Sequence, residues 1–207
     1  MKVAAPVRTN VIAVLVASTA ALIARAWLQL HLQTDGLAKG YASDLSFLIV
    51  PPIMMVLLAP VYCSDRTFLF HQFRRSAISA KLIVNAILIG VLLRLAAWSR
   101  LVAGASFGIH RSSDPLAVEG PVFGFQCASP AAVALGFVVM AAMVPVIEEV
   151  VHRAYVQSGL RHYGSVAAIV LSAGVFAVFH PTSSWLFSFV AGLVFGIQYW
   201  QTGSLWP

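Results

Sequence analysis

Two adjacent glutamates, a histidine and an arginine stand close together in a part of the chain that is otherwise apolar. They belong to the stretch MVPVIEEVVHRAYVQSGL, residues 143–160, and the preceding residues 131–147 carry no charge. An ionisable side chain is costly at bilayer depth, so its default interpretation is a functional group with a nearby partner. The candidates for chemistry in this stretch are Glu148, Glu149, His152 and Arg153.

Helical spacing divides these residues into two pairs. Residues four apart lie on the same face of an α-helix, so Glu149 is expected to point toward Arg153 and Glu148 toward His152. The first pair predicts an ion pair within one helix. Glu148 has no fixed cation of that kind and is the freer carboxylate.

A partner for Glu148 is expected from the next helix, which ends in FAVFH with His180. The turn between the two helices falls near Tyr163 and Gly164, about midway between Glu148 and His180. At a rise of ~1.5 Å per residue, the two side chains of an antiparallel hairpin then lie at nearly the same depth. A glutamate facing a histidine in this way can bind and activate a water molecule.

Two other interpretations of the polar cluster remain open. Polar pairs between membrane helices also hold bundles together, at around 0.6 kcal/mol each. In addition, EEVVH differs by one residue from the zinc motif H-E-x-x-H. Glu148, His152 and His180 could then be zinc ligands with Glu149 as the base.

The composition shows which kind of structure must position these residues. Of the 207 residues, 60% are hydrophobic and only 10% are charged, whereas soluble domains carry about 25% charged residues. Apolar stretches of ~20 residues can span a bilayer as helices. We therefore expect an all-α, polytopic transmembrane helix bundle in which residues 1–207 form a single membrane domain. Nucleic acid is not an expected partner, because the net charge of +6 is interpreted as loop charge that sets topology.

Six spans are expected from the apolar runs. Pro51 and Pro52 predict a kink or break in the second span. Ser129 is the expected cap of the fourth span, and Pro181 is expected to end the fifth. Gly192 and Gly196 form a GxxxG pair, which predicts close approach of the sixth span to another helix. The predicted spans cover residues 11–28, 45–62, 81–103, 130–159, 165–180 and 185–200.

Basic residues predict the orientation of the bundle. They concentrate before the first span and in the segment 63–81, whereas the loop 104–128 is balanced in charge. Basic loops stay in the cytoplasm. We expect a multi-pass protein of the cell membrane, most naturally a bacterial inner membrane, with a cytoplasmic N-terminus. The basic residues are Lys2 and Arg8 before the first span, and Arg66, Arg74, Arg75 and Lys81 in the segment.

The motifs resemble a known family. EEVVHR is similar to the EExxxR motif, and FAVFH to the FxxxH motif, of the CPBP family. This family contains the CAAX-processing and bacteriocin-processing (Abi) membrane proteases. The stretch GLVFGIQYWQTGSLWP is similar to the region that leads into the last motif of the family, so the resemblance covers roughly residues 133–207.

The resemblance implies a glutamic-type intramembrane protease without a metal or other cofactor. By analogy with the family, Glu148 activates the hydrolytic water, His180 is its partner on that water, and Glu149 and Arg153 form an orienting pair. The implied substrate is a membrane-associated protein or peptide, such as a prenylated protein or one with a C-terminal sorting signal. Membrane lipid is the other expected partner.

The chain departs from the family pattern in two places. His152 stands where the family more often has an aromatic or apolar residue. The final motif of the family, a histidine followed four residues later by asparagine, normally lies on a further helix after GSLWP. We therefore expect the 207-residue chain to be a weak or inactive protease, and a longer gene product to carry that helix. A membrane binding protein without catalysis, such as a bacteriocin-immunity factor, is the alternative function.

Overall fold

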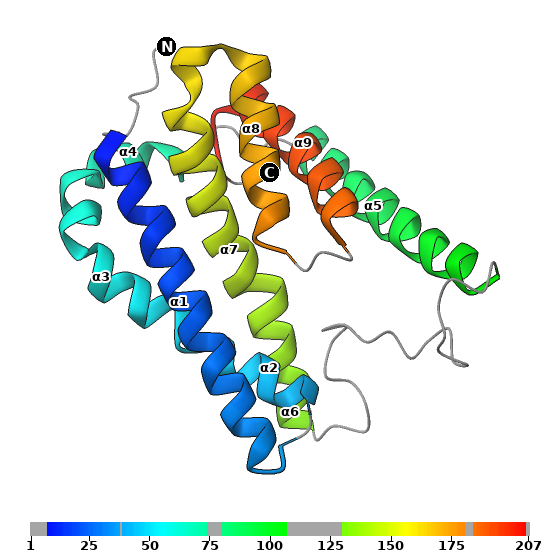
Figure 1. The fold of residues 1–207 in the computed structure, drawn as a ribbon. Coiled ribbons are helices and arrows are strands. Elements are labelled where there is room, and N and C mark those ends of the chain that lie inside the picture. The colour runs from blue at the N-terminus through cyan, green and yellow to red at the C-terminus, as the bar shows by residue number, and fades with distance from the viewer. Residues whose placement is uncertain (1–7, 38, 74–79, 107–129, 181–183, 206–207) are drawn as a thin grey trace.

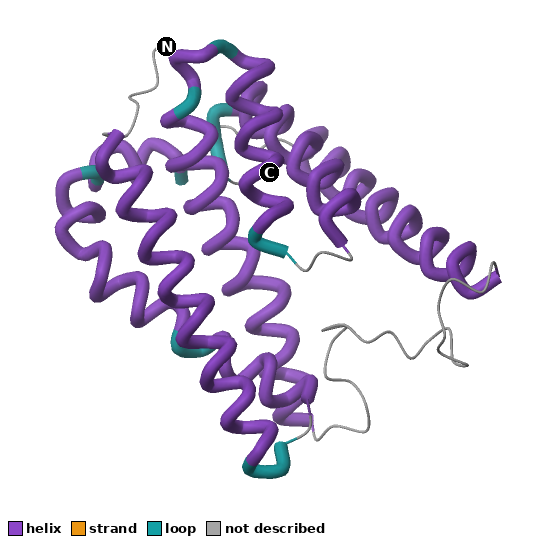
Figure 2. Tube along the Cα trace, viewed as in Figure 1, coloured by secondary structure: helices purple, strands orange, loops and turns teal. Residues whose placement is uncertain are grey.

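The described part of the chain is entirely helical. The computed structural model describes residues 8–37, 39–73, 80–106, 130–180 and 184–205. These residues form helices joined by short turns and contain no strand (Figure 2). The predicted all-α helix bundle is confirmed.

The helices follow the predicted spans closely in order and position. Their bounds are α1 (Arg8–Thr34), α2 (Lys39–Phe47), α3 (Val50–Ser64), α4 (Arg66–Gln72), α5 (Ala80–Ser106), α6 (Pro130–Val138), the π-helix η2 (Val139–Met143), α7 (Val144–Glu148), the π-helix η3 (Glu149–Gln157), the short 3-10 helix η4 (Arg161–Tyr163), α8 (Ser165–Val178) and α9 (Trp185–Thr202).

Three continuous helical stretches are long and apolar enough to cross a membrane, and α8 is a shorter apolar helix. The three stretches are Asn10–Thr34, Tyr41–Ser64 and Pro130–Gln157. The total of six spans therefore stays a prediction. The expected cap at Ser129, the expected stop at Pro181 and most of the loop 104–128 lie outside the described residues.

The second of these stretches is broken where its prolines predicted. Helix α2 ends at Phe47, and α3 begins at Val50 with Pro51 and Pro52 in its first turn. Proline has no backbone N–H and disfavours helical geometry in the residue before it. Two prolines are well tolerated in a first helical turn, where the N–H groups lack partners anyway. The break at residues 48–49 follows from this chemistry.

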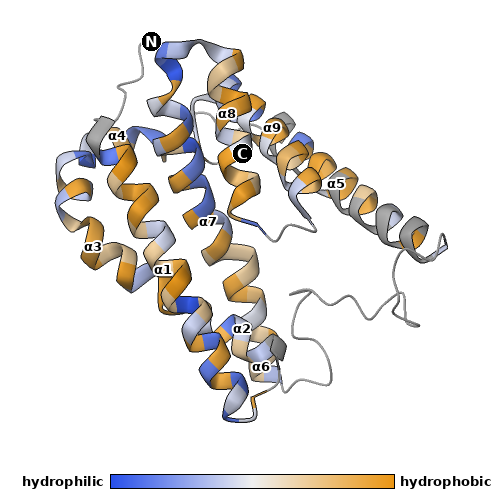
Figure 3. Cartoon of the chain, in the orientation of Figure 1, coloured by the Kyte–Doolittle hydropathy of each residue, from blue (hydrophilic) through white to orange (hydrophobic). Residues whose placement is uncertain are grey.

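The core lies between α1, α3 and η3. Val14, Leu58 and Tyr155 are each almost fully buried there. The outward faces, in contrast, expose large apolar side chains such as Trp27 and Leu186. Figure 3 shows apolar residues along much of the length of the helices. A bundle that is apolar outside as well as inside is suited to lipid as its solvent.

Helices α8 and α9 form a tightly packed hairpin. A Cβ atom built on Gly192 would lie 3.0 Å from both Cα and Cβ of Ala173 on α8. A Cβ atom on Gly196 would lie 3.2 Å from Oε1 of Gln157 and from Cγ2 of Ile169. The close approach predicted from the GxxxG pair is therefore present, with α8 and η3 as the neighbours.

One end of the bundle collects the start of α1, helix α4 and the end of α9 (Figure 1). Asn10 donates through Nδ2 to Oδ2 of Asp65 at 2.9 Å. The backbone N–H of Leu205 donates to the carbonyl of Gln72 at 2.9 Å. Arg8 and Arg66 begin the helices at this end, which is the end that we predict to be cytoplasmic.

Candidate active site

The two glutamates lie at a junction between different helix types. One continuous helical run passes from α6 through η2 and α7 into η3, and Glu148 ends α7 where Glu149 begins η3. Pro145 is in the first turn of α7, directly after η2. A proline ring collides with the carbonyl four residues earlier, and a wider π turn relieves that collision. Such π segments are frequent at functional sites.

Glu148 lies beside His180, as the hairpin count predicted. Oε1 of Glu148 is 3.6 Å from Nε2 of His180, and both side chains are about one third exposed. This distance exceeds that of a hydrogen bond. It allows one water molecule to contact both atoms.

The orientation of His180 is fixed by its surroundings. Its Nδ1 lies 2.8 Å from the backbone carbonyl of Phe176. A carbonyl oxygen only accepts, so Nδ1 carries a proton and donates it to this bond. In the neutral ring Nε2 then presents its lone pair toward Glu148. The indole N–H of Trp185 donates to the backbone carbonyl of His180 at 2.9 Å and holds the end of the hairpin.

Glu149 pairs with Arg153, as the spacing predicted. Nε of Arg153 is 3.6 Å from Oε1 of Glu149, and the arginine side chain is fully buried. The centre of its guanidinium group also lies 5.2 Å from the ring centroid of Phe176. A cation over an aromatic face is favourable when it is desolvated. Arg153 therefore links its pair with Glu149 on η3 to Phe176 on α8.

His152 is a packing residue in this structure. It is 3% exposed and lies edge-on between the rings of Phe176 and Phe179, with centroid distances of 5.1 and 5.3 Å. The described residues contain no group of three metal-binding side chains. Glu148, His152 and His180 thus do not converge as the ligand set that the zinc interpretation requires.

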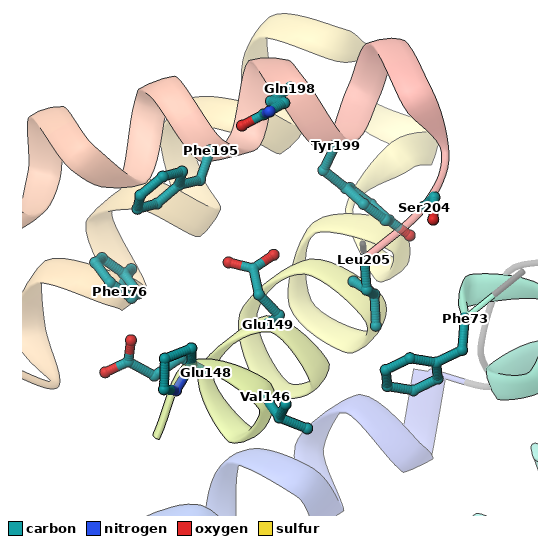
Figure 4. A pocket seen from close by; sticks show the side chains of 11 residues that line it. Phe73, Val146, Glu148, Glu149, Phe176, Phe195, Gln198, Tyr199, Ser204 and Leu205 are labelled. Atoms are coloured by element: carbon teal, nitrogen blue, oxygen red, sulfur yellow. The ribbon is translucent and has the colours of Figure 1, made fainter. Parts of the chain in front are cut away.

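A cavity of about 400 Å³ opens beside both glutamates. Figure 4 shows the Glu149 carboxylate pointing from the junction of α7 and η3 toward α9, which carries Phe195, Gln198 and Tyr199. The walls of the cavity are mainly apolar and come from α7, η3, α8, α9, the residue after α4 and the residues that follow α9. The lining residues are Phe73, Pro145, Val146, Glu148, Glu149, Phe176, Phe195, Gln198, Tyr199, Ser204 and Leu205.

A buried polar network fixes the far wall of this cavity. The Tyr199 hydroxyl donates to Oε1 of Gln72 and accepts from the Ser158 hydroxyl, with 2.7 Å between the two hydroxyl oxygens. All three side chains are almost fully buried. The network ties α4 and η3 to α9 and holds Phe73 at the cavity. The sequence analysis did not identify these residues. The adjacent Gln198 and Tyr199 in the apolar helix α9 were a signal that this helix has an inward polar face.

The site thus defines a class of protein: a membrane-type helix bundle with a carboxylate and a histidine facing each other beside an apolar cavity. Residues 130–207 match the family model described as "Type II CAAX prenyl endopeptidase Rce1-like". No curated protein and no solved structure matches the chain. The resemblance to the CPBP family is confirmed over residues 130–207, which include the two glutamates, Arg153 and His180. At the level of the family, this match supports a CAAX-type intramembrane protease.

Proposed function

We propose that this protein is an intramembrane endopeptidase that hydrolyses a peptide bond of a membrane-associated or C-terminally anchored protein. The observation that carries the proposal is the Glu148–His180 pair, with Oε1 and Nε2 3.6 Å apart beside the apolar cavity. Glu148 ends α7 and His180 lies just after α8, so two separate segments converge here, as a catalytic acid–base pair needs.

The pair can act on one water molecule. His180 donates through Nδ1 to the Phe176 carbonyl, so its Nε2 accepts one water O–H. The Glu148 carboxylate accepts the other O–H. The water oxygen then attacks the carbonyl carbon of the substrate while its proton passes to Glu148. When the C–N bond breaks, that proton moves to the leaving amine, so that a carboxyl group and an amine are released.

The Glu149–Arg153 pair supports this chemistry without touching the water. It braces η3 against α8 through the Phe176 ring, whose own carbonyl orients His180. Precise placement of this kind accounts for a large part of enzymatic rate. We therefore assign Glu149 and Arg153 as positioning residues.

The cavity suggests the substrate class. Its walls are mostly aromatic and aliphatic, with Phe73, Phe176 and Phe195 among them. Such a surface suits the apolar segment of a membrane-associated peptide, and a prenylated CAAX protein is the substrate named in the description of the family. Proteins with C-terminal sorting signals are the second candidate substrates. The proposed location is the cell membrane, with the N-terminus and α4 on the cytoplasmic side.

The test is a cleavage assay in liposomes with an internally quenched, farnesylated CAAX peptide. Glu148→Gln keeps the shape of the side chain but cannot accept the proton, so we expect the rate to fall by about 10²–10⁴. Asp35→Asn is the matched control, because Asp35 is an exposed acid at the end of α1. If Glu148→Gln binds the peptide as tightly as the wild type and its cleavage rate is unchanged, the protein is instead a non-catalytic binding protein.

A further inference from the structure

Gln198 is the polar residue of the cavity whose role the proposed mechanism leaves open. It lines the same cavity as Glu148 and Glu149, from the opposite helix α9. Its side chain is 8% exposed, and its amide nitrogen has no hydrogen-bond partner among the described residues. A buried N–H donor without a partner costs about 1–3 kcal/mol. Such a group requires an explanation in a folded protein.

The other polar groups of the cavity are acceptors or are already engaged. The two carboxylates accept hydrogen bonds when they are ionised. The Tyr199 hydroxyl donates to Gln72 and accepts from Ser158. Of the lining residues that the structure describes, Gln198 is thus the one that offers a side-chain N–H donor without a partner.

Hydrolysis creates a demand for such a donor. When water attacks the peptide carbonyl, the C=O double bond becomes a single bond and its oxygen takes a negative charge. Preorganised N–H groups stabilise that oxyanion, and the loss of one typically costs 10²–10³ in rate. We propose that the side-chain amide of Gln198 donates a hydrogen bond to the carbonyl oxygen of the scissile peptide, an inference that rests on the proposed function.

The helix around Gln198 is held in place before substrate binds. On one side, Nε2 of Gln157 donates to the carbonyl of Gly196 at 2.8 Å. On the other side, Tyr199 is fixed by its bonds to Ser158 and Gln72. Helix α9 is therefore anchored on both sides of Gln198, at Gly196 and at Tyr199. Such support is what a preorganised donor requires, because its position cannot relax during the reaction.

The experiment replaces the amide by an apolar side chain of similar length. Gln198→Met keeps the volume and removes the donor, and Gln201→Met is the matched control because Gln201 is exposed on the same helix. Both variants are assayed with the farnesylated CAAX peptide in liposomes, and their melting temperatures are measured in detergent. We expect Gln198→Met to lose 10²–10³ in kcat, with KM changed less than about threefold and a melting temperature equal to or above that of the wild type.

The readouts distinguish this role from a structural one and from failure of the proposed function. A residue that only supported the fold would lower the melting temperature when replaced, whereas removal of a buried donor without a partner does not. If Glu148→Gln is inactive but Gln198→Met keeps kcat within threefold, the inference is overturned and the proposed function stands. If Glu148→Gln cleaves the peptide as fast as the wild type does, the proposed function is overturned and the inference with it.

Discussion

Replacement of Arg153 by methionine would break the most deeply buried ion pair of the site. The Arg153 side chain is fully buried, Glu149 is 27% exposed, and their charged atoms are 3.6 Å apart. At that distance the attraction is about 4 to 5 kcal/mol for an effective dielectric constant of about 20. Removal of one partner from a buried pair costs about 3–5 kcal/mol. We expect Arg153→Met to lower the free energy of unfolding by about 3 kcal/mol, the lower end of this range, because Glu149 is partly exposed.

A double-mutant cycle with Glu149→Gln separates this pair from general damage to the helix. Both single variants leave one charge without its partner, so the double variant should lose less stability than the sum of the two. The expected coupling is on the order of 1–3 kcal/mol. Arg66→Met is the matched control, because Arg66 is an exposed arginine at the start of α4. It should cost less than about 1 kcal/mol.

The assay is unfolding in mixed micelles with increasing dodecyl sulfate, followed by circular dichroism. The free energies of unfolding of the four proteins in the cycle are compared under identical lipid and salt conditions. If the two single losses add to within about 0.5 kcal/mol of the double loss, Glu149 and Arg153 are energetically independent. The assignment of a positioning pair would then be refuted.

Two further predictions concern the helices that carry the site. Gly192→Ala places a Cβ atom 3.0 Å from Ala173, whereas the matched change Gly174→Ala meets open space. Gly192→Ala should lower the free energy of unfolding by about 1–3 kcal/mol through overpacking, and Gly174→Ala should not lower it. Equal melting temperatures of the two variants would contradict the close packing of α8 on α9. Tyr199→Phe removes the hydroxyl that joins Gln72 to α9. The free energy of unfolding should therefore fall by about 1–3 kcal/mol, and a soluble protease should cleave the chain at α4 faster. An unchanged cleavage rate would show that α4 is held in another way.

The geometry of the central pairs could be predicted because it depends on simple helical repeats. A fixed rise per residue places Glu148 and His180 at one depth in a hairpin, whatever the other helices do. The Glu149–Arg153 pair needs only one helical turn. Similarly, the break between α2 and α3 follows from the missing N–H of two prolines.

Other features of the site depend on tertiary contacts or on backbone detail that carries no periodic signal. The π-helical form of η3 changes the direction of each side chain, and His152 packs between Phe176 and Phe179. Phe73 reaches the cavity because Gln72 is bonded to the end of α9, across more than 120 residues of sequence. Contacts between such distant segments cannot be read from the spacing of residues within one helix.

The central claim is that Glu148 and His180 act together on one water molecule. The most direct measurement is kcat for the single variants Glu148→Gln and His180→Gln and for the double variant, with the farnesylated peptide in liposomes. Residues that act as a unit show strongly non-additive losses. The account predicts that each single variant loses about 10²–10⁴ and that the double variant loses no more than the worse of the two. Losses that multiply in the double variant, or a Glu148→Gln variant with wild-type kcat, would contradict it.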